Sequence, residues 1–136
     1  MNYLLDTNVV VALLRDKPEH VRARYRQEQS SGNALAVSSV VLFELWYGVE
    51  KSTPGRENTE RLRVFLSGDL DLLAFDDEDA QSAGRVRAAL EKSGTTIGAY
   101  DLLIAGQALR RGLTVVTANT SEFSRVPGLS WADWTS

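Results

Sequence analysis

The sequence predicts an α/β protein: a three-layer α/β/α sandwich with a mostly parallel central sheet. Short apolar runs that suit buried strands alternate along the chain with longer segments of helical periodicity. Helical segments separate successive strand-like runs, and such crossovers join parallel strands. The chain has 136 residues without an evident linker or repeat, so we expect residues 1–136 to form one domain.

Five strands are expected where apolar or β-branched runs stop at polar residues or glycine. They cover residues 3–5, 34–37, 70–75, 113–117 and 129–131. Between them, apolar residues at helical spacing predict six helices, with a further short helix between the last two strands. The six cover residues 9–14, 18–32, 40–52, 56–66, 76–94 and 98–111.

Capping residues justify the first three helices. Thr7 or Asn8 would cap the first helix, whose run is apolar all round and therefore buried. Pro18 suits the first turn of the second helix, because proline lacks the N–H that a first turn leaves unused. The serines at 38–39 would cap the third helix.

Breaks and charges justify the other three helices. The segment 53–55, Thr-Pro-Gly, separates the third helix from the fourth. Four consecutive acids at 76–79 complement the dipole at the start of the fifth helix, and we prefer this interpretation to a metal site there. Gly94 and Gly112 follow the fifth and sixth helices, where a left-handed residue commonly ends a helix.

Composition excludes several kinds of chemistry. The chain has no cysteine and a single histidine, His20, so thiol catalysis, a thiolate metal site and a two-histidine zinc site are ruled out within one chain. A signal peptide and an 18-residue apolar span are both missing from the sequence, so we expect a cytoplasmic protein without a membrane partner. The net charge of −3 argues weakly against nucleic acid as a partner.

Polar residues gather at the predicted carboxyl edge of the sheet, where ligands bind in open parallel folds. Asp6 follows the first strand, Thr117 closes the fourth, and Asn119 comes two residues later. Glu44 and Asp101 lie in apolar runs near the starts of two helices. A structural ion pair for Glu44 and a helix cap for Asp101 are the alternatives to a functional role.

Three acids at one edge would repel one another unless a cation lies between them, and oxygen ligands of this kind suit Mg²⁺ or Mn²⁺. Such an ion could support phosphodiester hydrolysis, or phosphorylation of an aspartate. Phosphorylation of an aspartate would require an acid two residues after Asp6 or a lysine after the fourth strand. The sequence has Asn8 at the first position and no lysine at the second, which favours hydrolysis.

Four segments together resemble a known family. They are residues 4–8, 38–49, 97–105 and 115–123, followed by the Val-Pro-Gly-Leu ending at 126–129. In order and spacing they resemble the PIN domain, and within it the VapC-type toxin ribonucleases of type II toxin–antitoxin modules. The resemblance spans nearly the whole chain.

The resemblance implies an endoribonuclease that needs Mg²⁺ or Mn²⁺ and hydrolyses RNA phosphodiester bonds, leaving a 5′-phosphate and a 3′-hydroxyl. Asp6 and Asp101 would hold the metal ion, while Glu44 would ligate it or orient the attacking water. It leaves open which RNA is cut and whether one or two ions bind. The alternative is a PIN-like module that binds RNA or protein without cutting.

One position departs from the family's fullest pattern. Many PIN domains carry a fourth acid after the fourth core strand, where this chain has the neutral Asn119. Glu122, one turn further on, is the candidate to take that place as a metal ligand. The hydroxyls of Thr7 and Thr117 would fix the geometry of the carboxylates or of water.

The resemblance also implies partners: a second copy in a homodimer, and a small antitoxin that lies across helices and inserts a basic side chain into the acidic pocket. The expected apolar surface for the antitoxin comprises Trp46, Tyr47, Leu62 and Phe65, unless these residues are ordinary core. The candidate phosphate contacts are Arg22, Arg24, Arg26, Arg85, Arg87, Arg110 and Arg111. If the four acids form a metal site, the remaining scaffold is close to neutral, and the objection to RNA disappears.

Overall fold

Five short parallel strands form the central sheet of the computed structural model, which describes residues 1–52 and 55–135. The strands are β1 (Tyr3–Leu5), β2 (Leu35–Ser38), β3 (Asp71–Leu73), β4 (Thr114–Val116) and β5 (Trp131–Ala132). Their order in the sheet is β3-β2-β1-β4-β5, so β1 lies at the centre. The order reverses between β1 and β4, because β4 returns to pair with β1 after β2 and β3 have extended the other side. A reversal of this kind opens a ligand crevice at the carboxyl edge.

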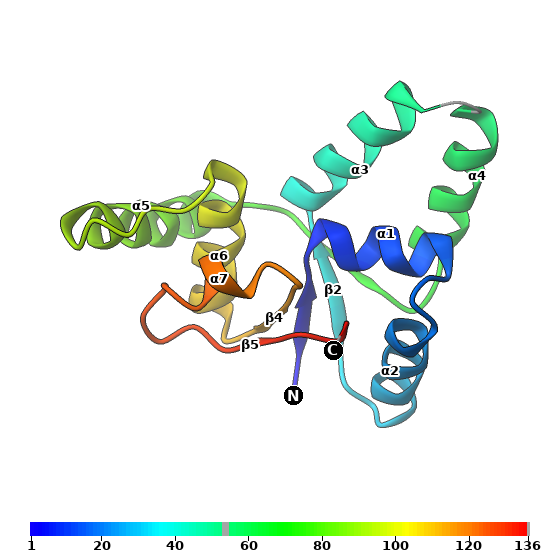
Figure 1. Cartoon of the computed structure of the whole chain (residues 1–136), viewed down its shortest axis with the longest axis horizontal. Coiled ribbons are helices and arrows are strands. Elements are labelled where there is room, and N and C mark those ends of the chain that lie inside the picture. Colours follow the sequence, from blue (N-terminus) through cyan, green and yellow to red (C-terminus); the bar gives the residue numbers. More distant parts are fainter. Residues whose placement is uncertain (53–54, 136) are drawn as a thin grey trace.

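Seven helices within the described residues cover the two faces of this sheet (Figure 1). They are α1 (Thr7–Arg15), α2 (Glu19–Ser30), α3 (Ser39–Lys51), α4 (Gly55–Leu66), α5 (Asp77–Lys92), α6 (Ala99–Arg111) and α7 (Thr120–Phe123). Helices α1 to α4 lie on one side of the sheet in Figure 1, and α5 to α7 lie on the other. None of these helices is long and apolar enough to cross a membrane.

The predicted fold class and the order of the elements are confirmed, with local differences. The cap of α1 is Asp6, whose carboxylate accepts from the Thr7 N–H, so the prediction of Thr7 or Asn8 was wrong. Pro18 is the N-cap of α2, one position before its first turn. The last strand begins at Trp131, later than expected. The break predicted at 53–55 falls partly on residues 53–54, which lie outside the described residues.

The buried core explains why the strands are so short. Every residue of β1, β2 and β4 is buried, whereas the edge strand β3 is largely exposed. Two or three apolar residues in each central strand are enough, because helices cover both faces. Helix α1 packs its Val9, Val10 and Leu13 into this core, and each side chain retains at most 1% exposure. The buried helix expected after Asp6 is therefore confirmed.

Helices α5 and α6 form a tightly packed pair. A Cβ atom added to Gly106 of α6 would lie 2.5 Å from the Cα and backbone N of Ala83 in α5, so only glycine permits this approach. The Ser82 hydroxyl donates to the carbonyl of Gly106 at 2.7 Å. Asp76 and Asp79 form a capping box at the start of α5, which confirms the helix-start interpretation of the acidic run.

Asp79 also has a second set of partners, which the sequence did not reveal. Its fully buried carboxylate accepts from Arg110 Nε at 2.8 Å and from Arg111 Nη2 at 2.9 Å, both in the last turn of α6. Gln107 Nε2 donates to the same carboxylate at 3.1 Å. This Asp79 clamp, comprising Asp79, Gln107, Arg110 and Arg111, ties the start of α5 to the end of α6.

Candidate active site

Three acids that are distant in the sequence line one pocket at the carboxyl edge of the sheet. The pocket has a volume of about 390 Å³. Its lining comprises Asp6, Thr7, Asn8, Glu44, Asp101, Ala118 and Asn119. The structure therefore brings together the three acids selected from the sequence. Asn8 is an additional lining residue, placed there because it lies two positions after Asp6 in the first turn of α1.

Pairing of β1 with β4 fixes the position of Asp6. Leu5 is the register partner of Val116, so the residues that follow them, Asp6 and Thr117, are neighbours at the strand ends. The Asp6 N–H donates to the carbonyl of Val116 at 2.9 Å. The buried Thr117 hydroxyl donates to Asp6 Oδ2 at 2.8 Å, while Oδ1 accepts from the N–H of Thr7. Both oxygens of the carboxylate are thus oriented by fixed donors.

Thr7 also orients the second acid. Its hydroxyl donates to Glu44 Oε1 at 2.8 Å. Glu44 lies in the second turn of α3, which Ser38 caps by accepting from the N–H of Val40. One threonine therefore joins the start of α1 to the acid of α3. Its contacts match the geometric role that the resemblance implied for this hydroxyl.

Asp101 belongs to a small network of its own, in the first turn of α6. Asn119 Nδ2 donates to Asp101 Oδ2 at 2.9 Å and also to Glu122. Glu122 Oε1 accepts from the backbone N–H of Gly98, the N-cap of α6, at 2.8 Å. Asn119 and Glu122 therefore connect the loop after β4 to the start of α6. Glu122 does not line the pocket as Asp101 does.

Burial and crowding leave these acids electrostatically strained. Burial, together with the nearby carboxylates of Glu122 and Asp6, raises the pKa of Asp101 to about 7. Burial likewise raises the pKa of Asp6, although the hydrogen bonds from Thr117 and Thr7 oppose the shift. Hydrogen bonds involving Asp101, Asn119 and Gly98 lower the pKa of Glu122. Such divergent pKa shifts within one cluster of acids are typical of functional sites.

The pocket supplies negative charge without a matching protein cation. Across residues 1–52 and 55–135, no Lys, Arg or His forms an ion pair with Asp6, Glu44, Asp101 or Glu122. Oxygen-only donors suit Mg²⁺ or Mn²⁺, so the residues present fit a hard divalent cation. Within residues 1–52 and 55–135, no three Asp, Glu or His side chains are already placed to hold a metal ion together. Glu44 and Glu122 instead accept hydrogen bonds, from the Thr7 hydroxyl and the Gly98 N–H.

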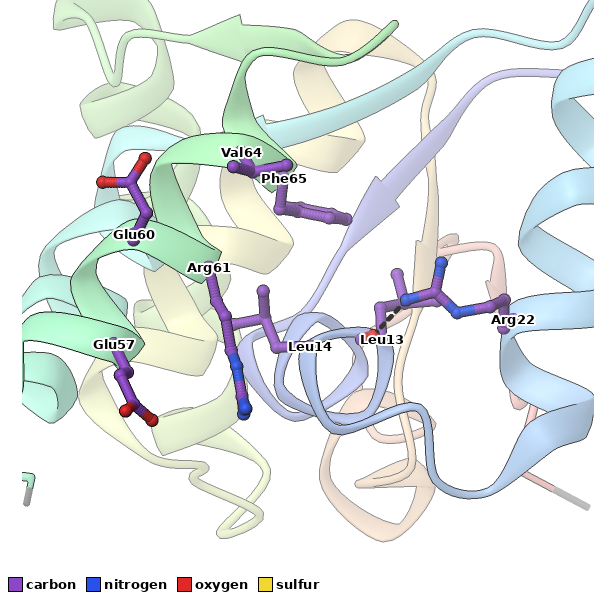
Figure 2. Close-up of a pocket in the computed structure, with 8 residues that line it drawn as sticks. All are labelled: Leu13, Leu14, Arg22, Glu57, Glu60, Arg61, Val64 and Phe65. Carbon is purple, nitrogen blue, oxygen red and sulfur yellow. Dashed lines mark hydrogen bonds between the residues drawn. The ribbon is translucent and has the colours of Figure 1, made fainter. Parts of the chain in front are cut away.

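Two further pockets adjoin this one along α1. The first, about 210 Å³, lies among α1, α3 and α4 and shares Thr7 and Glu44 with the acidic pocket. The second, about 550 Å³, lies between α1 and α4 and shares Leu14 and Arg61 with the first (Figure 2). Because neighbouring pockets share lining residues, the three form one groove that begins at the clustered acids and widens toward the 550 Å³ pocket.

The expected apolar surface for an antitoxin is only partly present. Phe65 lines the 550 Å³ pocket, as Figure 2 shows, and Tyr47 is exposed on α3. Trp46 is half-buried against the core and lies against the guanidinium of Arg63. Leu62 is fully buried, so its assignment to this surface was wrong and it is ordinary core. Leu14 of α1 and Val64 of α4 line the pocket instead, and the sequence could not show this because it depends on how α1 packs on α4.

The seven arginines selected as phosphate contacts do not line the acidic pocket. Five of them form ion pairs: Arg22 with Asp16, Arg24 with Glu28, Arg87 with Glu91, and Arg110 and Arg111 with Asp79. Arg26 and Arg85 are exposed on α2 and α5. Two other arginines, Arg15 and Arg61, line the 210 Å³ pocket, which shares Glu44 with the acidic pocket.

Comparison with known proteins identifies the family. The PIN domain model matches residues 3–129. A curated protein of Salmonella typhimurium named tRNA(fMet)-specific endonuclease VapC is 41% identical over 134 residues, which is 98% of each chain. Ribonuclease VapC2 of Rickettsia felis is 38% identical and also covers 98% of each chain.

Solved structures agree with this assignment. A chain of VapBC2 from Rickettsia felis, bound to a DNA fragment from its promoter, superposes with a TM-score of 0.91 at 37% identity, over 98% of this chain and 99% of that one. A chain of DNA-bound VapBC from Salmonella typhimurium gives a TM-score of 0.90 at 41% identity, over 98% of both chains. By sequence, by fold and by the acids at its sheet edge, the chain belongs to the PIN domain family, among its VapC-type members.

Proposed function

We propose that this protein is an endoribonuclease that hydrolyses RNA phosphodiester bonds with the help of Mg²⁺ or Mn²⁺. The observation that carries the proposal is the meeting of Asp6, Glu44 and Asp101 in one pocket that lacks a protein cation. The names of the VapC relatives support RNA as the substrate. The oxygen-only donor set supports the metal.

Asp6 and Asp101 would hold the cation, with Glu44 and Glu122 as the further candidates. A divalent ion at this place supplies a Lewis acid for the phosphoryl group and makes water a stronger nucleophile. The side chains of the pocket include no histidine, so carboxylates must do the acid–base work.

The protein groups would orient the reactants. Thr117 and the Thr7 N–H hold both oxygens of Asp6, so that carboxylate cannot swing out of the pocket. The Thr7 hydroxyl occupies Glu44 Oε1 and leaves Oε2 to accept a proton from the attacking water. Because these side chains are already oriented, less free energy is needed to rearrange them in the transition state.

A small antitoxin would regulate this activity by lying in the groove that runs along α1. The solved VapBC complexes support such a partner. The 550 Å³ pocket between α1 and α4 offers Phe65, Val64 and Leu14 to an apolar side chain of the partner (Figure 2). From there the groove leads to the acids, so a basic partner side chain could pair with them. The protein would thus act as the toxin of a toxin–antitoxin pair, with a homodimer as its expected assembly.

The test uses antitoxin-free protein with initiator tRNA, ribosomal RNA and a messenger RNA, each with Mg²⁺, with Mn²⁺ or with EDTA. We expect cleavage that EDTA abolishes and that Asp6→Asn and Asp101→Asn lose. The products should carry a 5′-phosphate and a 3′-hydroxyl. Equal cleavage by the wild type and both variants would contradict the site. Binding of RNA without cleavage under every metal condition would favour the non-cutting alternative.

A further inference from the structure

The acidic pocket continues into a second pocket that carries positive charge. The two share Thr7 and Glu44, and the second extends among α1, α3 and α4. Its remaining polar lining includes Arg15, Ser52, Asn58 and Arg61. Beyond the shared Glu44, the 210 Å³ pocket has no acid in its lining. The sign of the charge therefore changes along the groove, from negative at the acids to positive at the arginines.

Both arginines are available to a ligand. Arg15 and Arg61 are exposed on the surface, and neither forms an ion pair with any residue of the described ranges. Five of the seven arginines suggested by the sequence are, in contrast, paired with acids. An arginine already paired with a carboxylate is a weaker phosphate ligand, because the carboxylate occupies its donors.

The groove gives these arginines a defined position relative to the acids. Helix α1 starts directly after Asp6 and has Arg15 in its last turn, nine residues further on. At 1.5 Å per residue this places Arg15 about 13 Å along the helix from Asp6. Arg61 lies on α4 across the groove and extends beside Leu14 of α1 (Figure 2).

The positive stretch is bounded at its far end. The 550 Å³ pocket beyond Arg61 is lined by Glu57 and Glu60 of α4, and its Arg22 is paired with Asp16. A polyanion is therefore attracted to the segment between the acids and Arg61 and repelled beyond it. The groove has charge complementarity for a short length of nucleic-acid backbone.

We propose that Arg15 and Arg61 bind backbone phosphates of the RNA strand that flanks the scissile bond, and so set which bond reaches the acids. This proposal rests on the proposed ribonuclease function. The planar guanidinium group donates two parallel hydrogen bonds to a phosphate, which fixes both position and direction. Contacts with phosphate set the register of the strand and do not read its bases. A partner that covers this groove must displace the RNA.

The experiment measures RNA binding by the Asp101→Asn protein in Mg²⁺, with and without Arg15→Ala and Arg61→Ala. The probe is a single-stranded RNA that the wild type cleaves, or an initiator tRNA if no cleavage is found. Each phosphate contact on a single strand contributes about 0.7 to the magnitude of the slope of log affinity against log salt concentration. The slope measured for the Arg15→Ala/Arg61→Ala variant should therefore be shallower by about 1.4. At low salt its binding should be about tenfold weaker.

Arg26→Ala and Arg85→Ala in the same background form the matched control. These exposed arginines on α2 and α5 line neither the acidic pocket nor the 210 Å³ pocket, so their removal should leave affinity and salt slope nearly unchanged. Replacing single phosphates beside the cleavage site by neutral methylphosphonates should weaken binding to the parent protein and not to the Arg15→Ala/Arg61→Ala variant.

Equal losses in the test pair and the control pair would overturn the proposal, because general charge would then explain the binding. Loss of antitoxin binding with unchanged RNA binding would overturn it as well and would assign the arginines to the protein partner. Failure of the ribonuclease function is a separate result: the wild type would cleave nothing, whatever the binding of the variants.

Discussion

The two ends of α6 each hold a buried or half-buried carboxylate, and the two are treated in opposite ways. At the first turn, Asp101 shares one amide donor with Glu122 and has no cationic partner among the described residues. At the last turn, Arg110 and Arg111 bind Asp79 from α5 through three charge-assisted hydrogen bonds of 3.3 Å or less. The start of α6 thus carries an acid without a cationic partner, whereas the end of α6 supplies two arginines to an acid of α5.

The pKa directions follow from this difference. Asp79 is fully buried, which by itself raises the pKa, yet the hydrogen bonds from Arg111, the Asp76 cap and Arg110 hold its pKa well below the usual range. Burial and the neighbouring carboxylates raise the pKa of Asp101. A matched buried charge holds two helices together, whereas an unmatched one costs stability and is retained for a ligand.

The largest effect is expected from Asp101→Asn. It should lower RNA cleavage by about 10³-fold, because a carboxylate proposed to hold the cation is removed. The free energy of unfolding in EDTA should stay the same or rise, since the neutral amide relieves repulsion from Asp6 and Glu122. Cleavage assays and urea unfolding measure the two effects. A clear loss of stability would show that Asp101, like Asp79, stabilises the fold, and would contradict the difference between the two acids.

The next effect belongs to the other end of α6. Asp79→Asn should lower the free energy of unfolding by about 3 kcal/mol, because Arg110 and Arg111 lose their buried partner. Cleavage per folded molecule should not change. Asp77→Asn is the control: this neighbour is exposed on the same helix and should shift the unfolding free energy by less than about 0.5 kcal/mol.

Packing of α5 on α6 gives the third prediction. Gly106→Ala should lower the free energy of unfolding by about 2 kcal/mol, because its Cβ would meet the backbone of Ala83 at 2.5 Å. Gly84→Ala is the matched control on α5. The space around Gly84 is open, so the better helix propensity of alanine should stabilise the protein by about 0.5–1 kcal/mol. Equal losses for both variants would disprove the close approach.

The smallest effect depends on pH. The pKa of Asp79 is lowered by folding, so its ion pairs contribute fully above the unfolded value of about 3.9 and lose their contribution as pH falls below it. The stability difference between the wild type and Asp79→Asn should therefore be constant from pH 5 to 7 and shrink toward pH 3. Chemical unfolding at several pH values measures it. A difference that grows on acidification would contradict the assigned direction.

The sequence predicted the order of all the elements because each one carries its own local signals. Apolar runs define β1, β2 and β4, and caps such as Ser38 and Gly112 mark helix ends. It also predicted that Asp6, Glu44 and Asp101 would meet, because the ends of parallel strands share one edge. These inferences need only the topology.

The groove and the Asp79 clamp could not be predicted in the same way, because they depend on how helices pack. Asp79 and Arg110 are 31 residues apart, and the sequence does not indicate that α5 and α6 align their opposite ends. Arg15 and Arg61 become neighbours of one pocket only when α4 lies across α1. Glu122 was expected as a candidate metal ligand, and its additional bond from the Gly98 N–H depends on the exact position of the loop after β4.

The hydrogen bond between Thr117 and Asp6 joins residues that are 111 positions apart. A chain emerging from the ribosome therefore presents Asp6 and Glu44 long before it can assemble the pocket that contains them. Any product of premature termination before β4 lacks the strand that pairs with β1 and orients Asp6. The chain topology itself thus delays assembly of the proposed ribonuclease site until nearly the entire polypeptide has been synthesised.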